Sequence, residues 1–294
     1  MAIEYADVDK RNEGQHTVPR GILQNFNIEG TFGKKAQVYV FDKKINKVRP
    51  TRVSVYKITK EKGFYNVNID NKIKTIERPS LANLDDTASG IIKNIIEDKS
   101  LGNLTKADRS SLSEFIMIQT VRTKLPRLAL AEYFKELGIT LNGNELKKLT
   151  NTAVIDAEKC ASFINNKIWV LFKTSKSKPF YISDHPVVFG GGPYRWDLGI
   201  TNTKGIELYF PISKTLCLVI FCQSYEKQLL TCASKFKPLM RGLETGCSVP
   251  MNEKTVVYHN MLQIDFALRE VYSSINDFEL AYEMMANARL SRKK

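Results

Sequence analysis

The chain has 294 residues and a formal net charge of +13, with 44 Lys and Arg against 31 Asp and Glu. This length is sufficient for one large domain or two small ones with a sizeable core. No apolar run approaches the ~20 residues needed to cross a bilayer, and residues 1–10 lack the basic-then-apolar order of a signal peptide. We therefore expect a cytoplasmic protein with no membrane partner.

The excess of positive charge predicts a polyanionic partner, and nucleic acid is the commonest polyanion in a cell. Lysine is concentrated in short clusters, for example at 173–178 and 292–294. A solvated lysine-rich surface without a partner has the same composition, so both interpretations stay open. The five cysteines are scattered without a CxxC pair, which indicates neither a zinc knuckle nor a disulfide framework. We expect no cofactor and no metal site.

The first predicted helix begins near Pro19, where proline fits the first turn because its missing N–H would have no partner there. His16 stands four residues before Arg20. If helical geometry reaches back to His16, the two side chains lie one turn apart and face one pocket. The apolar face of this helix is formed by Ile22, Leu23 and Phe26.

Alternating and apolar patterns predict the remaining elements. Two pairs of strands come first, at 38–41 with 53–56 and at 64–67 with 73–76. Helices are expected over 80–98, 106–123 and 142–165, the second with Thr105 as N-cap and a kink at Pro126. Further strands are predicted at 168–172, 180–182, 208–210 and 216–221, and further helices at 252–273 and 278–290.

Strands and helices therefore come in blocks, which predicts an α+β fold. An N-terminal helix and hairpins, central long helices, a second β segment and C-terminal helices would surround a shared core. We expect a single domain over 1–294, either undivided or with two lobes, 1–142 and 143–294, that meet at Asn142 and Gly143.

Gln119 and Arg122 lie three residues apart in the second long helix and share a face of it. That face adjoins the apolar stripe at 115–118, so both groups are expected to be partly buried. A buried arginine needs a carboxylate, a phosphate or carbonyl oxygens to offset its lost hydration. Arg122 is therefore either a phosphate ligand or half of a structural Arg–Asp bridge.

The segment Ser183-Asp184-His185-Pro186 follows a predicted strand directly. Pro186 ends the strand, and loops at strand ends carry many functional residues. Asp184 could orient His16, pair with an arginine or accept a proton itself. The alternative is an Asx-turn, in which its carboxylate only accepts nearby backbone N–H groups.

Three later features complete the candidates. The run 190–193 predicts a loop that can act as a lid, flanked by Tyr194, Arg195 and Trp196, which either stack on bases or simply pack. Lys178 precedes the Asp184 segment. Asn260 offers hydrogen-bond donors and acceptors from the C-terminal helix, unless it only faces solvent.

The order of these motifs resembles domain-of-unknown-function family 4238, over roughly residues 15–274. The resemblance implies no activity. It implies only that five polar residues occupy motif positions of that family, namely His16, Arg20, Gln119, Arg122 and Asp184. The motifs that carry it are His16-x-x-Pro19-Arg20, Gln119-x-x-Arg122-Thr123, Ser183-Asp184-x-Pro186, Phe210-Pro211-Ile212-Ser213 and the helix around Asn260.

A pocket with a histidine, two arginines, an amide and a carboxylate fits phosphodiester chemistry. We predict a metal-independent nuclease that acts on RNA rather than DNA, in a defence or toxin setting. His16 would be the acid/base group, Arg20 and Arg122 would hold the phosphate, and Asp184 would orient His16. The predicted substrate-binding residues are Gln119, Asn260, Lys178 and Arg195.

Two other functions remain open. The first is a non-catalytic basic module that binds nucleic acid or a protein, in which the polar clusters are structural bridges. The second is a nucleotide or NAD hydrolase, in which Asp184 acts on the sugar. We rank it lower because the chain has no dinucleotide fingerprint.

Overall fold

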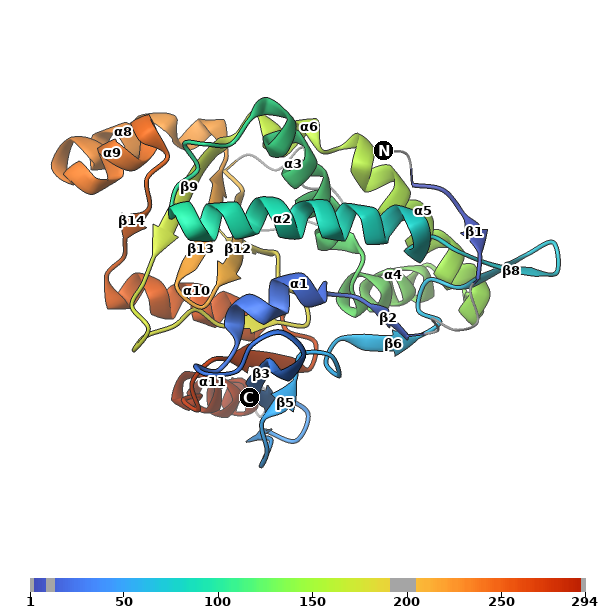
Figure 1. The fold of residues 1–294 in the computed structure, drawn as a ribbon. Coiled ribbons are helices and arrows are strands. Elements are labelled where there is room, and N and C mark those ends of the chain that lie inside the picture. The colour runs from blue at the N-terminus through green and yellow to red at the C-terminus, as the bar shows by residue number, and fades with distance from the viewer. Residues whose placement is uncertain (1–2, 9–13, 191–204, 292–294) are drawn as a thin grey trace.

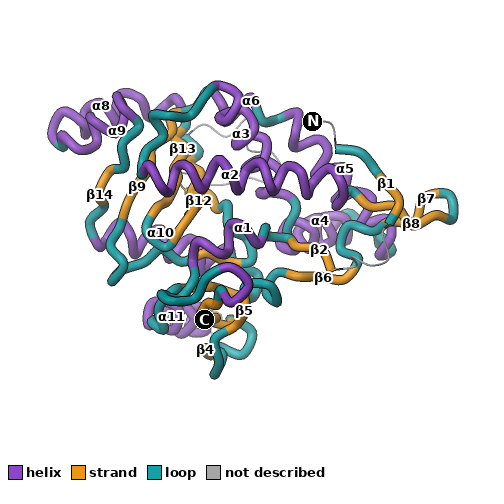
Figure 2. Tube along the Cα trace, viewed as in Figure 1, coloured by secondary structure: helices purple, strands orange, loops and turns teal. Residues whose placement is uncertain are grey.

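The computed structural model describes residues 3–8, 14–190 and 205–291 (Figure 1). Helices and strands are segregated along the chain and pack together as an α+β fold, which confirms the predicted class (Figure 2). Within the described residues, no helix is long and apolar enough to cross a membrane.

The larger sheet has the strand order β11-β12-β13-β9-β14, antiparallel except for the last pair. Its central strands are almost continuously buried, because helices pack on them. The rings of Phe115 in α3 and Phe210 in β12 lie 6.0 Å apart between centroids. The strands are β9 (Ile168–Lys173), β11 (Val188–Gly190), β12 (Glu207–Ser213), β13 (Leu216–Phe221) and β14 (Val249–Pro250).

A second sheet has the order β10-β15-β3-β4, with β5 also paired to β3. Helix α11 packs on it, since the Tyr282 ring meets the Phe41 ring edge-on with centroids 5.1 Å apart. This sheet contains the predicted pairing of 38–41 with 53–56, which is confirmed. Its strands are β3 (Gln37–Asp42), β4 (Lys47–Val48), β5 (Val53–Ser54), β10 (Ile182–Ser183) and β15 (Glu270–Ser273).

Five short strands form two smaller sheets, β2-β6 and β1-β8-β7. The predicted second hairpin is confirmed, and Asp70 and Asn71 both have positive φ in its two-residue turn. The strands are β1 (Ala6–Asp7), β2 (Gly14–His16), β6 (Lys60–Lys62), β7 (Val67–Ile69) and β8 (Lys72–Thr75).

The predicted helices are present in the predicted order, but the one expected over 142–165 is interrupted after Lys159, and two helices over 226–245 were not predicted. Thr105 caps α3 with Asp108 in a capping box, as predicted. A main hydrophobic cluster joins residues of both sequence halves, for example Ile22 and Leu218. The helices are α1 (Arg20–Leu23), α2 (Ala82–Asp98), α3 (Lys106–Val121), α4 (Lys124–Glu136), α5 (Gly143–Lys159), α6 (Ser162–Asn165), α8 (Glu226–Lys235), α9 (Lys237–Thr245), α10 (Glu253–Phe266) and α11 (Glu279–Ser291).

Three other local predictions were wrong. The helix expected over 252–273 stops at Phe266, because residues 270–273 pair as β15 with β3 and β10. No single helix kinks at Pro126, since the chain leaves α3 after Val121 and starts α4 at Lys124. Helical geometry does not reach His16, which ends strand β2, while Pro19 has a non-helical ψ of 137°.

Candidate functional site

Arg122 is the most deeply buried charged side chain of the motifs, with 1% of its surface exposed. Its guanidinium donates two hydrogen bonds to the Asp85 carboxylate, at 2.7 and 3.0 Å. A bidentate pair of this kind satisfies the charge without any external anion. The structural Arg–Asp bridge, one of the two predicted alternatives, is therefore what Arg122 forms.

The carbonyl of Thr17 connects two of the motifs. It accepts hydrogen bonds from Gln119 Nε2 at 2.9 Å and from Arg122 Nε at 3.3 Å. The Tyr65 hydroxyl donates to the carbonyl of Arg122 at 3.1 Å. Gln119 and Arg122 thus fix the backbone beside His16 from inside the core.

His16 is partly buried, and Arg20, four residues later, is exposed. Nε2 of His16 is buried and has no hydrogen-bond partner among the described residues. Burial, and then the positive charges of Arg20 and Lys60, lower the pKa of His16 to about 4, so the ring is neutral at pH 7. The exposed guanidinium of Arg20 lies over the Tyr56 ring, 4.3 Å from its centroid.

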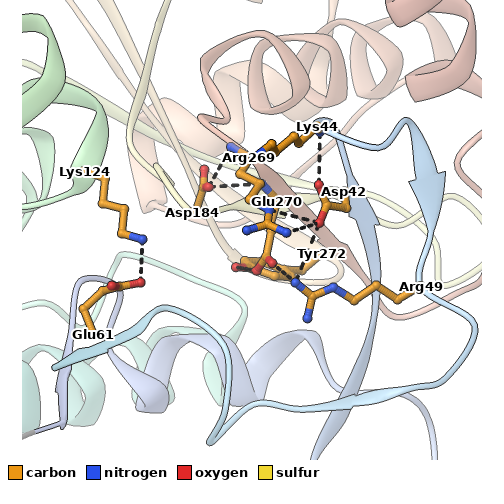
Figure 3. Close-up of polar contacts among 9 residues, drawn as sticks. All are labelled: Asp42, Lys44, Arg49, Glu61, Lys124, Asp184, Arg269, Glu270 and Tyr272. Carbon is orange, nitrogen blue, oxygen red and sulfur yellow. Dashed lines mark hydrogen bonds and ion pairs between the residues drawn. The ribbon is translucent and has the colours of Figure 1, made fainter.

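Asp184 directly follows β10, and its carboxylate accepts three backbone N–H groups (Figure 3). These come from Leu268 at 2.9 Å, Arg269 at 2.8 Å and Glu270 at 3.0 Å. The carboxylate therefore fixes the turn between α10 and β15. The Asx-turn alternative was wrong, because the N–H donors lie 84 to 86 residues away in the sequence instead of next to Asp184. Burial raises the pKa of Asp184 to about 6, while the three N–H bonds act in the opposite direction.

Asp184 also lines a cavity of about 660 Å³, which we call the Asp184 cleft. One wall is the sheet of β10, β15 and β3, and the other includes residues of β6 and α4. Figure 3 shows Lys124 and Glu61 on the side opposite Asp184. The charged residues that line the cleft are Lys43, Lys44, Lys124, Arg269, Glu61, Asp184 and Glu270.

Most cations of the cleft have an internal partner. Lys124 Nζ lies 2.5 Å from Glu61, and Arg269 lies 2.8 Å from Asp42. The ammonium of Lys43 donates to the carbonyls of Ile264 and Ala267, at 2.6 and 2.5 Å, and so caps the end of α10. Two further contacts surround Glu270, an ion pair with Arg49 and a hydrogen bond of 2.8 Å from the Tyr272 hydroxyl.

The rest of the Ser183–Pro186 segment is held by buried hydrogen bonds. Nδ1 of His185 lies 2.6 Å from the Thr123 hydroxyl, which joins this motif to the one around Arg122. Complete burial lowers the pKa of His185 to about 4. Gln263 of α10 donates to the Pro186 carbonyl at 2.8 Å and accepts from the Ser183 hydroxyl at 2.9 Å.

Asn260 lies one helical turn before Gln263 in α10 and also bonds backbone groups. Its side chain accepts from the Tyr181 N–H at 2.8 Å and donates to the Pro179 carbonyl at 3.1 Å. Asn260 and Lys178 line a different pocket of about 240 Å³, where Lys178 pairs with Glu253 at 2.9 Å. Arg195 and the lid predicted at 190–193 lie, apart from Gly190, outside the described residues.

The structure thus brings the predicted site residues together in three groups. Gln119 and Arg122 bond the Thr17 carbonyl next to His16, and Asn260 shares a small pocket with Lys178. Of the seven predicted site residues that the structure describes, only Asp184 lines the cleft. No group of three His, Cys, Asp or Glu side chains suited to a metal ion exists among the described residues. The cleft residues that sequence reasoning missed are Glu61, Lys124, Arg269 and Glu270.

Two signals in the sequence could have indicated part of this arrangement. The spacing of Asn260 and Gln263 places two amides on one face of α10. The Asp42-Lys43-Lys44 run directly follows a predicted strand, which is a common position for site residues. Glu61 and Lys124, which lie across the cleft from Asp184, are distant from it in the sequence and belong to no motif that includes it.

One family model matches residues 14–277, and its description is protein of unknown function (DUF4238). The match includes every motif from His16 to Asn260. No curated protein and no solved structure matches the chain.

Proposed function

Because the chain belongs to the DUF4238 family, whose description assigns no activity, we propose from the Asp184 cleft that the protein is a metal-independent nuclease acting on RNA. The observation that carries this proposal is a carboxylate fixed by three N–H groups on the wall of a cavity rimmed by cations. The volume of about 660 Å³ is in the range of roughly 300–1,000 Å³ that is typical of ligand sites.

Asp184 would be the general base. A pKa of about 6 leaves the carboxylate ionised at pH 7 but more basic than an ordinary aspartate. It would take the proton of the 2′-hydroxyl, whose oxygen attacks phosphorus while the bond to the 5′-oxygen breaks. The departing oxygen would take a proton from the Lys124 ammonium, which water restores.

Lys124 and Arg269 would offset the charge that develops on the phosphate oxygens. Both are exposed at one side, and surface ion pairs such as Lys124–Glu61 contribute only about 0–1 kcal/mol. A phosphate can therefore replace Glu61 as the partner of Lys124 at little cost, whereas Arg269 would contact phosphate while keeping its bonds to the buried Asp42. In this proposal Gln119 and Arg122 fix the cleft wall through the Thr17 carbonyl, and neither Arg122 nor His16 contacts substrate.

Cleavage of a labelled RNA in the presence of EDTA tests the proposal. We expect Asp184→Asn to lower the rate by about 100-fold or more, the usual effect of losing a general base. Asp265→Asn is the matched control, because Asp265 is exposed and interacts with Lys43 but does not line the cleft. Thermal unfolding of each variant separates loss of the base from loss of the fold. Equal rates in the wild type and a folded Asp184→Asn protein would contradict the proposal.

A second candidate is a non-catalytic module that binds nucleic acid or a protein. It is favoured by the internal hydrogen bonds that occupy Gln119, Arg122 and Asn260. If the wild-type protein binds RNA but yields no cleavage product at any pH tested, this candidate is favoured. Including NAD in the same assay tests the nucleotide hydrolase alternative, since Glu61, Asp184 and Glu270 could bind sugar hydroxyls.

A further inference from the structure

A second cavity, of about 590 Å³, lies where α9 and β14 meet the ends of α2 and β9. In Figure 1 this region is at the end of the molecule away from β3 and β6. Its charged lining residues are all basic, and we call it the basic pocket. They are Lys99, Lys173, Lys237 and Arg241.

Backbone hydrogen bonds fix the segments that carry these side chains. The Ser248 N–H donates to the Lys99 carbonyl at 3.0 Å, and the Met251 N–H donates to the Lys173 carbonyl at 2.9 Å. Strand β14 pairs in parallel with β9 up to Lys173. The basic pocket is therefore part of the folded framework, although the four cationic side chains are exposed.

The four cations have no carboxylate within ion-pair distance in the part of the chain that the structure describes. This differs from the Asp184 cleft, where Lys124 and Arg269 each have one. Four like charges around one cavity repel each other, and a bound anion removes that repulsion. The pocket therefore presents uncompensated positive charge that an anionic ligand can match.

Helix α9 adds to the same field. Lys237 is its first residue, where the helix dipole already provides partial positive charge and a lysine is unfavourable. Pro238 has no N–H, and the N–H groups of Leu239 and Met240 donate to the Phe236 carbonyl, so the side chains rather than the helix end supply the donors of this pocket. The Ser248 hydroxyl has no hydrogen bond within the described residues and is a further available donor.

We infer that the basic pocket binds the phosphodiester backbone of a nucleic acid. Contacts to phosphate position a strand and carry no sequence information, so RNA and DNA of one sequence should bind similarly. The inference concerns binding at a place distinct from the Asp184 cleft and does not require the proposed nuclease.

Binding of labelled single-stranded RNA and DNA of about 16 nucleotides tests the inference. Each phosphate contact contributes about 0.7 to the slope of log affinity against log salt. Four contacts predict that raising salt from about 50 to about 200 mM weakens wild-type binding about 50-fold. The double variant Lys237→Gln/Arg241→Gln keeps two contacts, so the same rise in salt should weaken its binding only about 7-fold.

Lys34→Gln/Lys227→Gln is the matched control, because it removes the same charge from exposed lysines that do not line the basic pocket. It should retain the wild-type salt dependence. Equal loss of affinity in both double variants, or no binding by the wild type, would overturn the inference.

Cysteine alkylation locates the ligand independently. Cys247 lines the basic pocket, whereas Cys232 is exposed on α8 and does not. Bound RNA should slow alkylation of Cys247 and leave Cys232 unchanged, as followed by peptide mass spectrometry. Equal rates at Cys247 with and without RNA would overturn the inference.

Failure of this inference is distinguishable from failure of the nuclease proposal. A dinucleotide is too short to depend on a distant backbone contact, so its cleavage should be unaffected by Lys237→Gln/Arg241→Gln. Asp184→Asn should lower cleavage of both substrates by about 100-fold or more and retain binding of the longer strand. Inorganic phosphate alone should compete weakly, since it replaces only one of several phosphates.

Discussion

Arg122 and Asp184 are both charged residues of the family motifs, yet Arg122 is buried and Asp184 is partly exposed. Arg122 is paired with a carboxylate inside the core, and neither group lines the Asp184 cleft. Within the described residues, Asp184 has no cationic side chain among its hydrogen-bond donors; it accepts three backbone N–H groups and lines the cleft. The comparison teaches that membership of a motif does not by itself distinguish a charge paired inside the core from one that faces a cavity.

The largest expected effect is on stability at Arg122. Arg122→Ala leaves Asp85 buried without its partner, and we expect a loss of about 3–5 kcal/mol in the free energy of unfolding. Arg20→Ala is the comparison, since an exposed cation–π contact contributes only about 0.5–1 kcal/mol. Urea denaturation measures both, and similar losses in the two variants would contradict the difference in roles.

A smaller loss is expected at Asp184. Asp184→Asn keeps one oxygen as an acceptor and removes a partly buried charge, so we expect about 1–3 kcal/mol of destabilisation at pH 7. The same urea measurement applies. A loss as large as that of Arg122→Ala would mean that the two charges have the same structural role.

The contribution of His185 to the pH dependence of the free energy of unfolding gives a further test. Its folded pKa of about 4 lies below the unfolded value of about 6.5, so the folded state binds fewer protons between these values and stability falls on acidification. His185→Gln is expected to be less stable than the wild type by about 1–3 kcal/mol at pH 7, because the bond with Thr123 changes. That gap should narrow by about 2 kcal/mol at pH 5, since only the wild type must keep a histidine neutral. An unchanged difference in unfolding free energy between the two proteins from pH 7 to pH 5 would contradict a neutral, buried His185 in the folded state.

The smallest effect is expected at Lys124. Lys124→Ala should change the free energy of unfolding by only about 0–1 kcal/mol, because its ion pair with Glu61 is half exposed. In the nuclease proposal it should still weaken RNA cleavage. A variant with wild-type cleavage would remove Lys124 from the proposed site.

Much of the fold could be predicted from the sequence, because the periodic segments are long. The cap at Thr105 and the turn at Asp70 and Asn71 follow from local chemistry that acts within four residues. Residues 270–273 were predicted as helix because the spacing of their apolar residues is compatible with a helix and with a strand. Only the pairing of this segment with β3 and β10 makes it a strand. Local patterns cannot report such a distant partner.

The site was harder to predict for the same reason. The sequence indicated Asp184 as a strand-end carboxylate, and it left Arg122 open between a bridge and a phosphate ligand. The partner that decides the second case, Asp85, is 37 residues away in another helix. The opposite wall of the cleft, with Glu61 and Lys124, has no motif that connects it with Asp184.

The most direct test is the pH dependence of RNA cleavage in EDTA. If Asp184 is the base, the rate should rise with pH and level off, with a midpoint near its pKa of about 6, and Asp184→Asn should abolish this rise. The Asp265→Asn protein should follow the wild-type profile. No cleavage by the wild type, or the same profile in a folded Asp184→Asn protein, would contradict the account.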